Sequence, residues 1–203
     1  DITLFTRQGV ERIQRFAFEI ARSRPRKLLT LVTKSNAQRH GMVMWDEIFG
    51  EISQDYRDIT TDKMLVDAMT TRMVLDPQSI DTVVASNLHA DILTDLAASL
   101  SGSMGIAPTG NLDPEKRHPS MFEPIHGSAF DIMGQGIAKP IGSFWSAVMM
   151  LENLGELKAS QRLMSAIEKL TSDKKILPKD LGGKSSTKEV TKAMINIISG
   201  KNK

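Results

Sequence analysis

Short apolar runs rich in strand-forming residues alternate with amphipathic stretches of helical period through the first half of this sequence. Residues 7–22 repeat apolar side chains at helical spacing, and the leucine-, threonine- and valine-rich run at 27–33 favours a strand. The alternation continues with expected strands at 57–63 and 80–85 and expected helices at 42–56, 65–75 and 89–100. Such alternation is typical of α/β proteins with parallel strand pairing. We therefore expect an α/β fold, with 80–85 as its best buried strand.

The second half of the chain has a different composition. Residues 101–142 are rich in glycine and proline, so we expect long loops there, and long loops often carry binding residues. Further helices are expected at about 143–154, 159–172 and 187–199. The change in composition near Gly102 predicts a boundary between a unit of residues 1–102 and a unit of residues 103–203.

The composition excludes several classes of protein. The chain has 203 residues, 40% hydrophobic and 25% charged, which is ordinary for a soluble globular protein with a real core. The absence of cysteine excludes disulfides, zinc ribbons and thiol nucleophiles. A net charge of +2 is too balanced for a typical nucleic-acid-binding module, and no apolar run approaches the roughly 18 residues of a membrane helix. We expect a cytoplasmic protein with neither nucleic acid nor membrane among its partners.

Asp91 and Asp95 lie four residues apart on the expected helix 89–100. Residues with this spacing share one helix face, with Cβ atoms roughly 5–6 Å apart. Two carboxylates so placed repel each other unless water or a cation separates them, and hard divalent ions such as Mg²⁺ and Mn²⁺ prefer oxygen ligands. The pair is a candidate metal site, with a solvated acidic face as the alternative.

Lys34 follows the expected strand 27–33 directly. Ligands of α/β proteins gather at the carboxyl ends of the strands, where a partly buried lysine can act as a base. An ordinary surface lysine in a loop is the alternative.

The segment from Glu123 to Asp131 reads Glu-Pro-Ile-His-Gly-Ser-Ala-Phe-Asp. A turn of small residues exposes backbone N–H groups that can hold phosphate, and a nearby carboxylate can accept from ribose hydroxyls. An ordinary polar turn is the alternative. The glycines at 134 and 136 do not complete a Rossmann fingerprint, because Lys139 occupies the place of the third glycine.

Three segments, taken in order, resemble one family. They are 32–36 (Val-Thr-Lys-Ser-Asn), 84–96 (Val-Ala-Ser-Asn-Leu-His-Ala-Asp-Ile-Leu-Thr-Asp-Leu) and 122–132 (Phe-Glu-Pro-Ile-His-Gly-Ser-Ala-Phe-Asp-Ile). Together they resemble the metal-dependent β-decarboxylating dehydrogenases, which include isocitrate and isopropylmalate dehydrogenases. Residues 5–10 and 105–112 look most like the tartrate/D-malate dehydrogenase branch. The resemblance implies an isopropylmalate-dehydrogenase-like fold with a mixed sheet and flanking helices.

The resemblance also implies catalytic and metal-binding roles. Lys34 matches the lysine that assists proton transfer at the substrate hydroxyl. Asp67 matches a catalytic, metal-binding aspartate contributed across a dimer interface, and Asp91 and Asp95 match the other two ligands of Mg²⁺ or Mn²⁺. The implied protein is a homodimer with a shared active site that acts on a dicarboxylate.

Cofactor roles follow from the same resemblance. The implied NAD-binding residues are Asn36 on the nicotinamide side, then Glu123, His126, Gly127, Ser128, Ala129, Asp131 and Lys139. Asp131 stands where NADP-dependent relatives carry a cation, so a carboxylate there favours NAD. Relatives have asparagine at the position of Lys139, Phe-Gly in place of His89-Ala90, and proline in place of Phe130.

Members of this family are roughly one and a half to two times as long as this chain. The expected missing part is N-terminal and would supply the arginines that bind the substrate carboxylates and the catalytic tyrosine. Two hypotheses follow. The chain belongs to an NAD- and metal-dependent oxidoreductase of a (2R)-hydroxy dicarboxylate, tartrate or D-malate, that ends in β-decarboxylation. Alternatively, it is a truncated, non-catalytic dimeric remnant.

Overall fold

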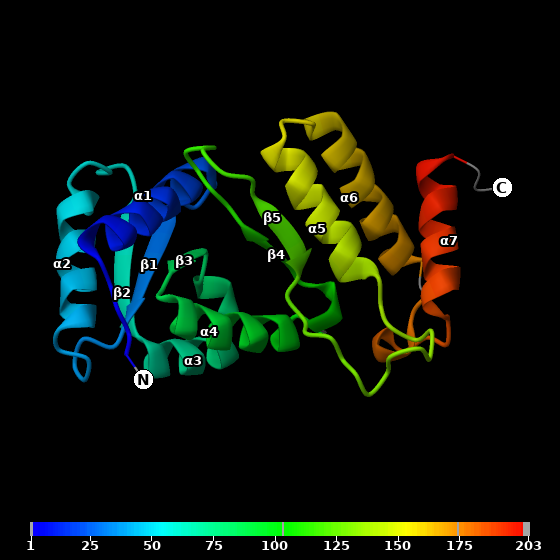
Figure 1. Ribbon diagram of the computed structural model, residues 1–203, viewed down its shortest axis with the longest axis horizontal. Coiled ribbons are helices and arrows are strands. Elements are labelled where there is room, and N and C mark those ends of the chain that lie inside the picture. Colours follow the sequence, from blue (N-terminus) through cyan, green and yellow to red (C-terminus); the bar gives the residue numbers. More distant parts are fainter. Residues whose placement is uncertain (1, 103, 174, 201–203) are drawn as a thin grey trace. The chain divides into compact units, whose positions relative to one another are not determined.

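The chain divides into two compact units, Asp1–Ala97 and Ala98–Lys203. The structure is a computed structural model and describes residues 2–102, 104–173 and 175–200 (Figure 1). Within these residues no helix combines the length and the apolar character needed to cross a membrane.

The first unit is built around a parallel sheet of three strands in the order β2-β1-β3. Its strands are β1 (Leu28–Thr33), β2 (Thr60–Leu65) and β3 (Thr82–Val84), and its helices are α1 (Arg7–Ser23), α2 (Gly41–Ser53), α3 (Val66–Leu75) and α4 (Asn87–Leu100), with a 3₁₀ turn at Pro77–Ser79. The parallel pairing expected from the alternating pattern is confirmed.

Strand β1 is the most deeply buried strand of this unit, because it lies between the other two. Five of its six residues are buried, whereas β3 has only three residues. The prediction that 80–85 would be the best buried strand was therefore wrong. Apolar content along the chain does not reveal which strand takes the central position, and the order of the sheet decides it.

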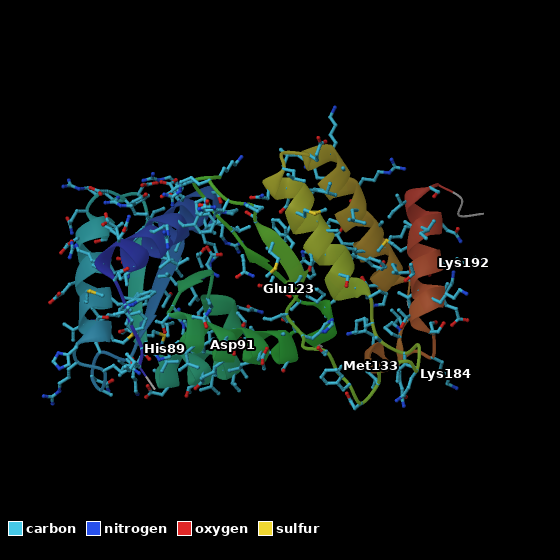
Figure 2. All side chains as sticks on the ribbon, viewed as in Figure 1. His89, Asp91, Glu123, Met133, Lys184 and Lys192 are labelled. Carbon is cyan, nitrogen blue, oxygen red and sulfur yellow. The ribbon has the colours of Figure 1, made fainter. Side chains whose placement is uncertain are left out.

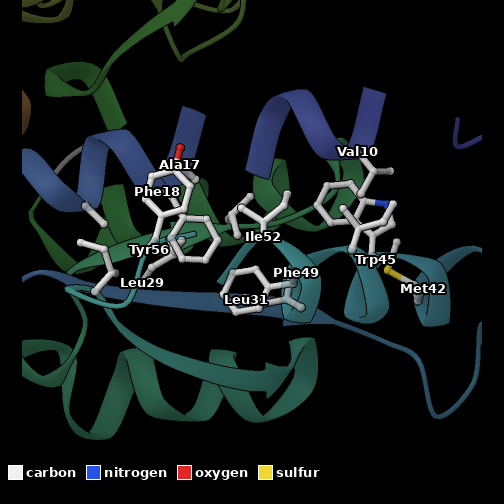
Figure 3. Close-up of a cluster of buried hydrophobic side chains, with 14 residues drawn as sticks. Val10, Ala17, Phe18, Leu29, Leu31, Met42, Trp45, Phe49, Ile52 and Tyr56 are labelled. Carbon is white, nitrogen blue, oxygen red and sulfur yellow. The ribbon is translucent and has the colours of Figure 1, made fainter. Parts of the chain in front are cut away.

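Hydrophobic clusters cover both faces of this sheet. Leu29 and Leu31 join the cluster that includes α1 and α2, while Val32 joins the cluster of α3 and α4. This division follows from the period of two along a strand, which points successive side chains to opposite faces. Figure 3 shows the first cluster, in which Phe18 stacks on Phe49 and on Tyr56, with ring centroids 5.1 Å and 4.7 Å away.

The boundaries near Tyr56 differ from the sequence expectation for a local reason. Helix α2 ends at Ser53 rather than at residue 56, and β2 begins at Thr60 rather than at residue 57. Between them, backbone N–H groups of Tyr56 and Ile59 donate to carbonyls three residues earlier, which forms successive turns. These turns place Tyr56 in the core, so its aromatic ring serves packing and does not extend the helix.

The second unit combines an antiparallel pair of strands with three helices. Its elements are a 3₁₀ turn (Met104–Ile106), β4 (Pro108–Asn111), β5 (Met121–Pro124), α5 (Ile141–Asn153), α6 (Leu157–Ser172), a 3₁₀ turn (Lys179–Leu181) and α7 (Thr187–Ile198). Helix α5 packs against α6 and against β5. Buried side chains of all three helices form the core, among them Ile141, Ile167 and Val190.

The pair β4–β5 lies in the segment that sequence analysis assigned to loops. Thr109 pairs with Glu123 and Asn111 pairs with Met121 in antiparallel register. The glycine and proline content led to the prediction of loops here, because both residues are generally depleted in strands.

Candidate functional site

Lys34 and Asp67 meet beyond the carboxyl ends of two paired strands. Thr33 and Leu65 are the last register partners of β1 and β2, so the chain reaches Lys34 on one side and the start of α3 on the other. Lys34 Nζ donates to Asp67 Oδ1, in the first turn of α3. This hydrogen bond lowers the pKa of Asp67, whose side chain is 64% exposed, while that of Lys34 is 27% exposed. The site therefore holds a cation and a carboxylate side by side at the strand ends.

The loop after Lys34 is fixed by contacts that the sequence did not predict. The backbone carbonyl of Lys34 accepts from the N–H groups of Ala37 and Gln38, at 3.0 Å and 2.8 Å. Ser35 Oγ donates to Asp46 Oδ2 on α2 over 2.8 Å. Asn36 is exposed in the same turn. One signal could have been noticed in the sequence, because Asp46 and Glu47 are adjacent acids inside the otherwise apolar segment 42–49.

His89 is buried on α4, two residues before Asp91 (Figure 2). Burial lowers its pKa, and the positive charge of Lys34 lowers it further. Its Nδ1 atom is buried without a hydrogen-bond partner. The structure therefore gives His89 a buried imidazole whose pKa is lowered by burial and by Lys34, where sequence analysis recognised only a departure from the family pattern.

Helix α4 carries Asp91 and Asp95 on one face, as their spacing predicts. Asp91 is exposed and Asp95 is half-buried. Two carboxylates on one face offer the hard oxygen donors that Mg²⁺ and Mn²⁺ prefer, so the chemistry of this pair fits such an ion.

A single copy of the chain does not bring the three predicted metal ligands together. Within residues 2–102, 104–173 and 175–200, no three histidine or acidic side chains cluster as a metal site. Asp67 is instead held by Lys34. The predicted assignment of Asp67 to the metal depends on a second copy and stays a prediction.

Five of the predicted cofactor residues line one pocket in the second unit. His126, Gly127, Ser128 and Ala129 border a cavity of about 780 Å³, together with Met133 and neighbouring glycines of the following loop. Lys139 also lines this pocket and is only 8% exposed. Among the described residues that line it there is no aspartate or glutamate. The pocket therefore presents small residues, exposed backbone and one lysine side chain, which suits the phosphate-bearing half of a dinucleotide.

Close packing explains a glycine at the edge of this pocket. A Cβ at Gly105 would come within 3.2 Å of the Lys139 side chain, which is tighter than ordinary contact. Thr187, at the start of α7, also lines the pocket. Its N–H donates to the carbonyl of Gly136 over 2.8 Å and its hydroxyl donates to the carbonyl of Ala138. Helix α7 thereby holds the segment that leads to Lys139, a role that sequence analysis missed.

Three predicted cofactor residues are not among the lining residues of the pocket, namely Asn36 of the first unit and two carboxylates of the second. Glu123 is exposed on β5, and Asp131 is exposed in the loop that follows Ala129 (Glu123 is labelled in Figure 2). The structure brings neither carboxylate to the cavity wall, so Lys139, and not Asp131, is the charged side chain buried there.

The sequence profile described as isocitrate/isopropylmalate dehydrogenase matches residues 1–197. This chain belongs to the isocitrate/isopropylmalate dehydrogenase family. A solved structure supports the same fold. The isocitrate dehydrogenase from Methylococcus capsulatus matches with a TM-score of 0.93 at 38% identity, covering 97% of this chain and 58% of that one. The isopropylmalate-dehydrogenase-like α/β fold expected from the motifs is confirmed.

Curated relatives carry the names that the sequence motifs favoured. A probable tartrate dehydrogenase/decarboxylase of Agrobacterium vitis is 63% identical over 202 residues, which cover 100% of this chain and 56% of the relative. The decarboxylating D-malate dehydrogenase of Escherichia coli (strain K12) is 45% identical, covering 97% of this chain and 55% of the relative. The chain thus spans a little over half the length of these relatives.

Proposed function

We propose that the protein containing this chain is an oxidoreductase that uses NAD and a divalent cation to oxidise and decarboxylate a (2R)-hydroxy dicarboxylate, tartrate or D-malate. The observation that carries this proposal is the Lys34–Asp67 pair at the strand ends of a chain 63% identical to a probable tartrate dehydrogenase/decarboxylase. The relatives' names support an oxidoreductase. The identities of the substrate and the cofactor are the more specific part of the proposal and go beyond the general activity that these names support.

In this mechanism the neutral amine form of Lys34 would accept the proton of the substrate hydroxyl, and NAD, when bound, would supply the acceptor for the hydride of C2. Asp67 holds Lys34 Nζ through their hydrogen bond and so fixes where that proton is received. The bound cation would supply polarisation of the C2 oxygen, with Asp91 and Asp95 as its ligands. CO₂ then leaves from the β-carboxylate.

The adenosine half of NAD is assigned to the pocket of the second unit. His126, Ser128 and the backbone at Gly127 line it, and Lys139 is buried in its wall. Asn36, exposed beside Lys34, is assigned to the nicotinamide side.

The proposed protein is a homodimer whose second copy contributes Asp67 to the pair on α4. Two observations support a partner at this helix. Leu88 and Ile92 are exposed apolar residues four positions apart, 64% and 51% exposed, directly beside the stripe of Asp91 and Asp95. The described part of one chain also lacks a three-ligand cluster of its own.

Three measurements test the proposal. NADH formation from D-malate or tartrate with Mn²⁺ tests the reaction, titration calorimetry with Mn²⁺ tests the metal, and sedimentation tests the dimer. Asp91→Asn and Asp95→Asn should each weaken Mn²⁺ binding about tenfold or more, because the number of charged ligands sets affinity. Asp76→Asn, an exposed aspartate at the end of α3, is the matched control.

A non-catalytic dimer is the alternative that these measurements separate from the enzyme. A folded dimer that binds neither Mn²⁺ nor NADH would contradict the proposed oxidoreductase for this chain. Turnover that disappears in Asp91→Asn and survives in Asp76→Asn would contradict the non-catalytic alternative.

A further inference from the structure

Ser35, like its neighbour Lys34, has its side chain hydrogen-bonded to another element of the first unit. Its Oγ donates to Asp46 Oδ2 over 2.8 Å, and Asp46 lies on α2. The side chain of Asp46 is only 16% exposed, so this hydrogen bond is shielded from competing water.

Asp46 has a second partner that fixes its orientation. Lys63 Nζ lies 3.0 Å from the same Oδ2 atom that accepts from Ser35. Lys63 belongs to β2 and is the register partner of Leu31, so its backbone is fixed by the sheet. The carboxylate of Asp46 is therefore held between a helix and a strand, and it presents one oxygen to Ser35.

The fixed carboxylate of Asp46 restricts the backbone conformation at Lys34, because it holds Ser35, the residue next to Lys34 in the sequence. The carbonyl of Lys34 already accepts two N–H groups from the turn that follows. With Ser35 anchored, the backbone at residue 34 is constrained on its carboxyl side by the Asp46 contact and on its amino side by β1. These constraints direct the long Lys34 side chain toward Asp67, with which it pairs.

We propose that Asp46 and Lys63 are positioning residues, which act through Ser35 to hold Lys34 against Asp67. They touch no part of the proposed site themselves. The proposal rests on the proposed function for the role of Lys34, but the geometry of Lys34 can be measured without turnover.

The test is competitive labelling of lysines in the folded chain with an N-hydroxysuccinimide ester, read by mass spectrometry for each lysine. A hydrogen bond of this kind changes a local equilibrium by about fivefold, so Ser35→Ala and Asp46→Ala should each raise the labelling rate of Lys34 by about that factor. Ser35→Thr keeps the hydroxyl and should restore the original rate. Lys27, at the other end of β1, reports any general loosening and should not change.

A double variant tests whether Ser35 and Asp46 affect Lys34 labelling through one shared contact or through two independent contacts. Ser35→Ala with Asp46→Ala should raise Lys34 labelling no more than either single change, because both remove the same contact. Lys63→Met is the mildest variant, since that side chain is 56% exposed, and it should raise the rate by up to about twofold. Asp58→Asn is the matched control, because it removes another carboxylate–cation pair of this unit, at the opposite end of the strands.

An unchanged Lys34 rate in folded Ser35→Ala and in Lys63→Met would overturn the proposal, as would additive effects in the double variant. In the active protein, Ser35→Ala should lower kcat with little change in the KM for NAD, and Ser35→Thr should recover it. A parent protein without turnover counts against the proposed function alone, because the labelling result stands by itself.

Discussion

Lys34 and Asp67 are joined by a hydrogen bond although they are 33 residues apart in sequence. Each follows the end of a strand, and the parallel register of β1 and β2 sets these ends side by side. The pair is the best-defined charged contact at the proposed catalytic edge of the first unit.

Removing either charge of this pair should impair catalysis far more than stability. We expect Lys34→Met and Asp67→Asn to lower turnover by about 10²–10⁴-fold, the usual contribution of a positioned acid or base. The melting temperature should change little, because the Asp67 side chain is largely exposed and solvent screens the pair. Steady-state NADH formation and thermal melting measure the two effects. Asp58→Asn should leave turnover at the parent level, and an equal loss there would contradict a specific role.

Thr187→Val should loosen the pocket proposed to bind the cofactor. The substitution keeps the shape of the side chain and removes the hydroxyl that donates to the Ala138 carbonyl. We expect a loss of about 0.5–1.5 kcal/mol in stability, and weaker NADH binding by fluorescence titration. Thr191→Val is the control, since Thr191 donates within α7, to the Thr187 carbonyl, and does not line the pocket. Equal weakening of NADH binding in both variants would show that the effect is not local.

Phe18→Ala should unfold the first unit readily. Phe18 is fully buried and stacks on two aromatic rings. Truncation leaves a cavity and should cost about 3–5 kcal/mol in the free energy of unfolding, measured by denaturant titration. Ile20→Ala, on the same helix but 40% exposed, should cost about 1 kcal/mol or less. A similar cost for both would contradict the proposed core.

The acid stability of the first unit should depend on Asp58. Hydrogen bonds from the Arg22 guanidinium lower the pKa of Asp58 from 3.8 to about 2. Because the unfolded chain binds this proton more readily than the folded chain, the stabilisation is fully present above pH 3.8 and is lost as the pH falls toward 2. Asp58→Asn should flatten the pH dependence of unfolding between about pH 4 and 2, measured by circular dichroism. Glu47→Gln, which changes an exposed carboxylate on α2, should leave that slope unchanged.

The hydrophobic period of the sequence predicted most of the helices and the class of the fold. The helical spacing at 7–22 predicted α1, and the i, i+4 spacing of Asp91 and Asp95 placed them correctly on one face. The turn from His126 to Ala129 lines the pocket, and its predicted role in binding a cofactor stays a prediction. Local sequence was sufficient in these cases because the helix repeat and the turn chemistry are local properties.

Several features depended on neighbours distant in sequence. The pair β4–β5 escaped notice because its pairing compensates for unfavourable strand residues. Asp46, one of two adjacent acids in a largely apolar segment, acquired a role only when α2 brought it to Ser35. Tyr56 continued the helical pattern, yet α2 ends at Ser53 and the turns that follow place the Tyr56 ring against Phe18.

The sequence by itself determined the α/β class, the helices and the residues whose side chains could bind or catalyse. Hydrophobic period and side-chain chemistry are local properties that can be read directly from the sequence. Only the tertiary structure decided that β1 is central, that Lys34 meets Asp67, and that Lys139 lines the pocket while Asp131 does not. The reason is physical. Strand order, register and burial minimise the free energy of the whole fold, and contacts between residues tens of positions apart contribute to it without leaving a local pattern.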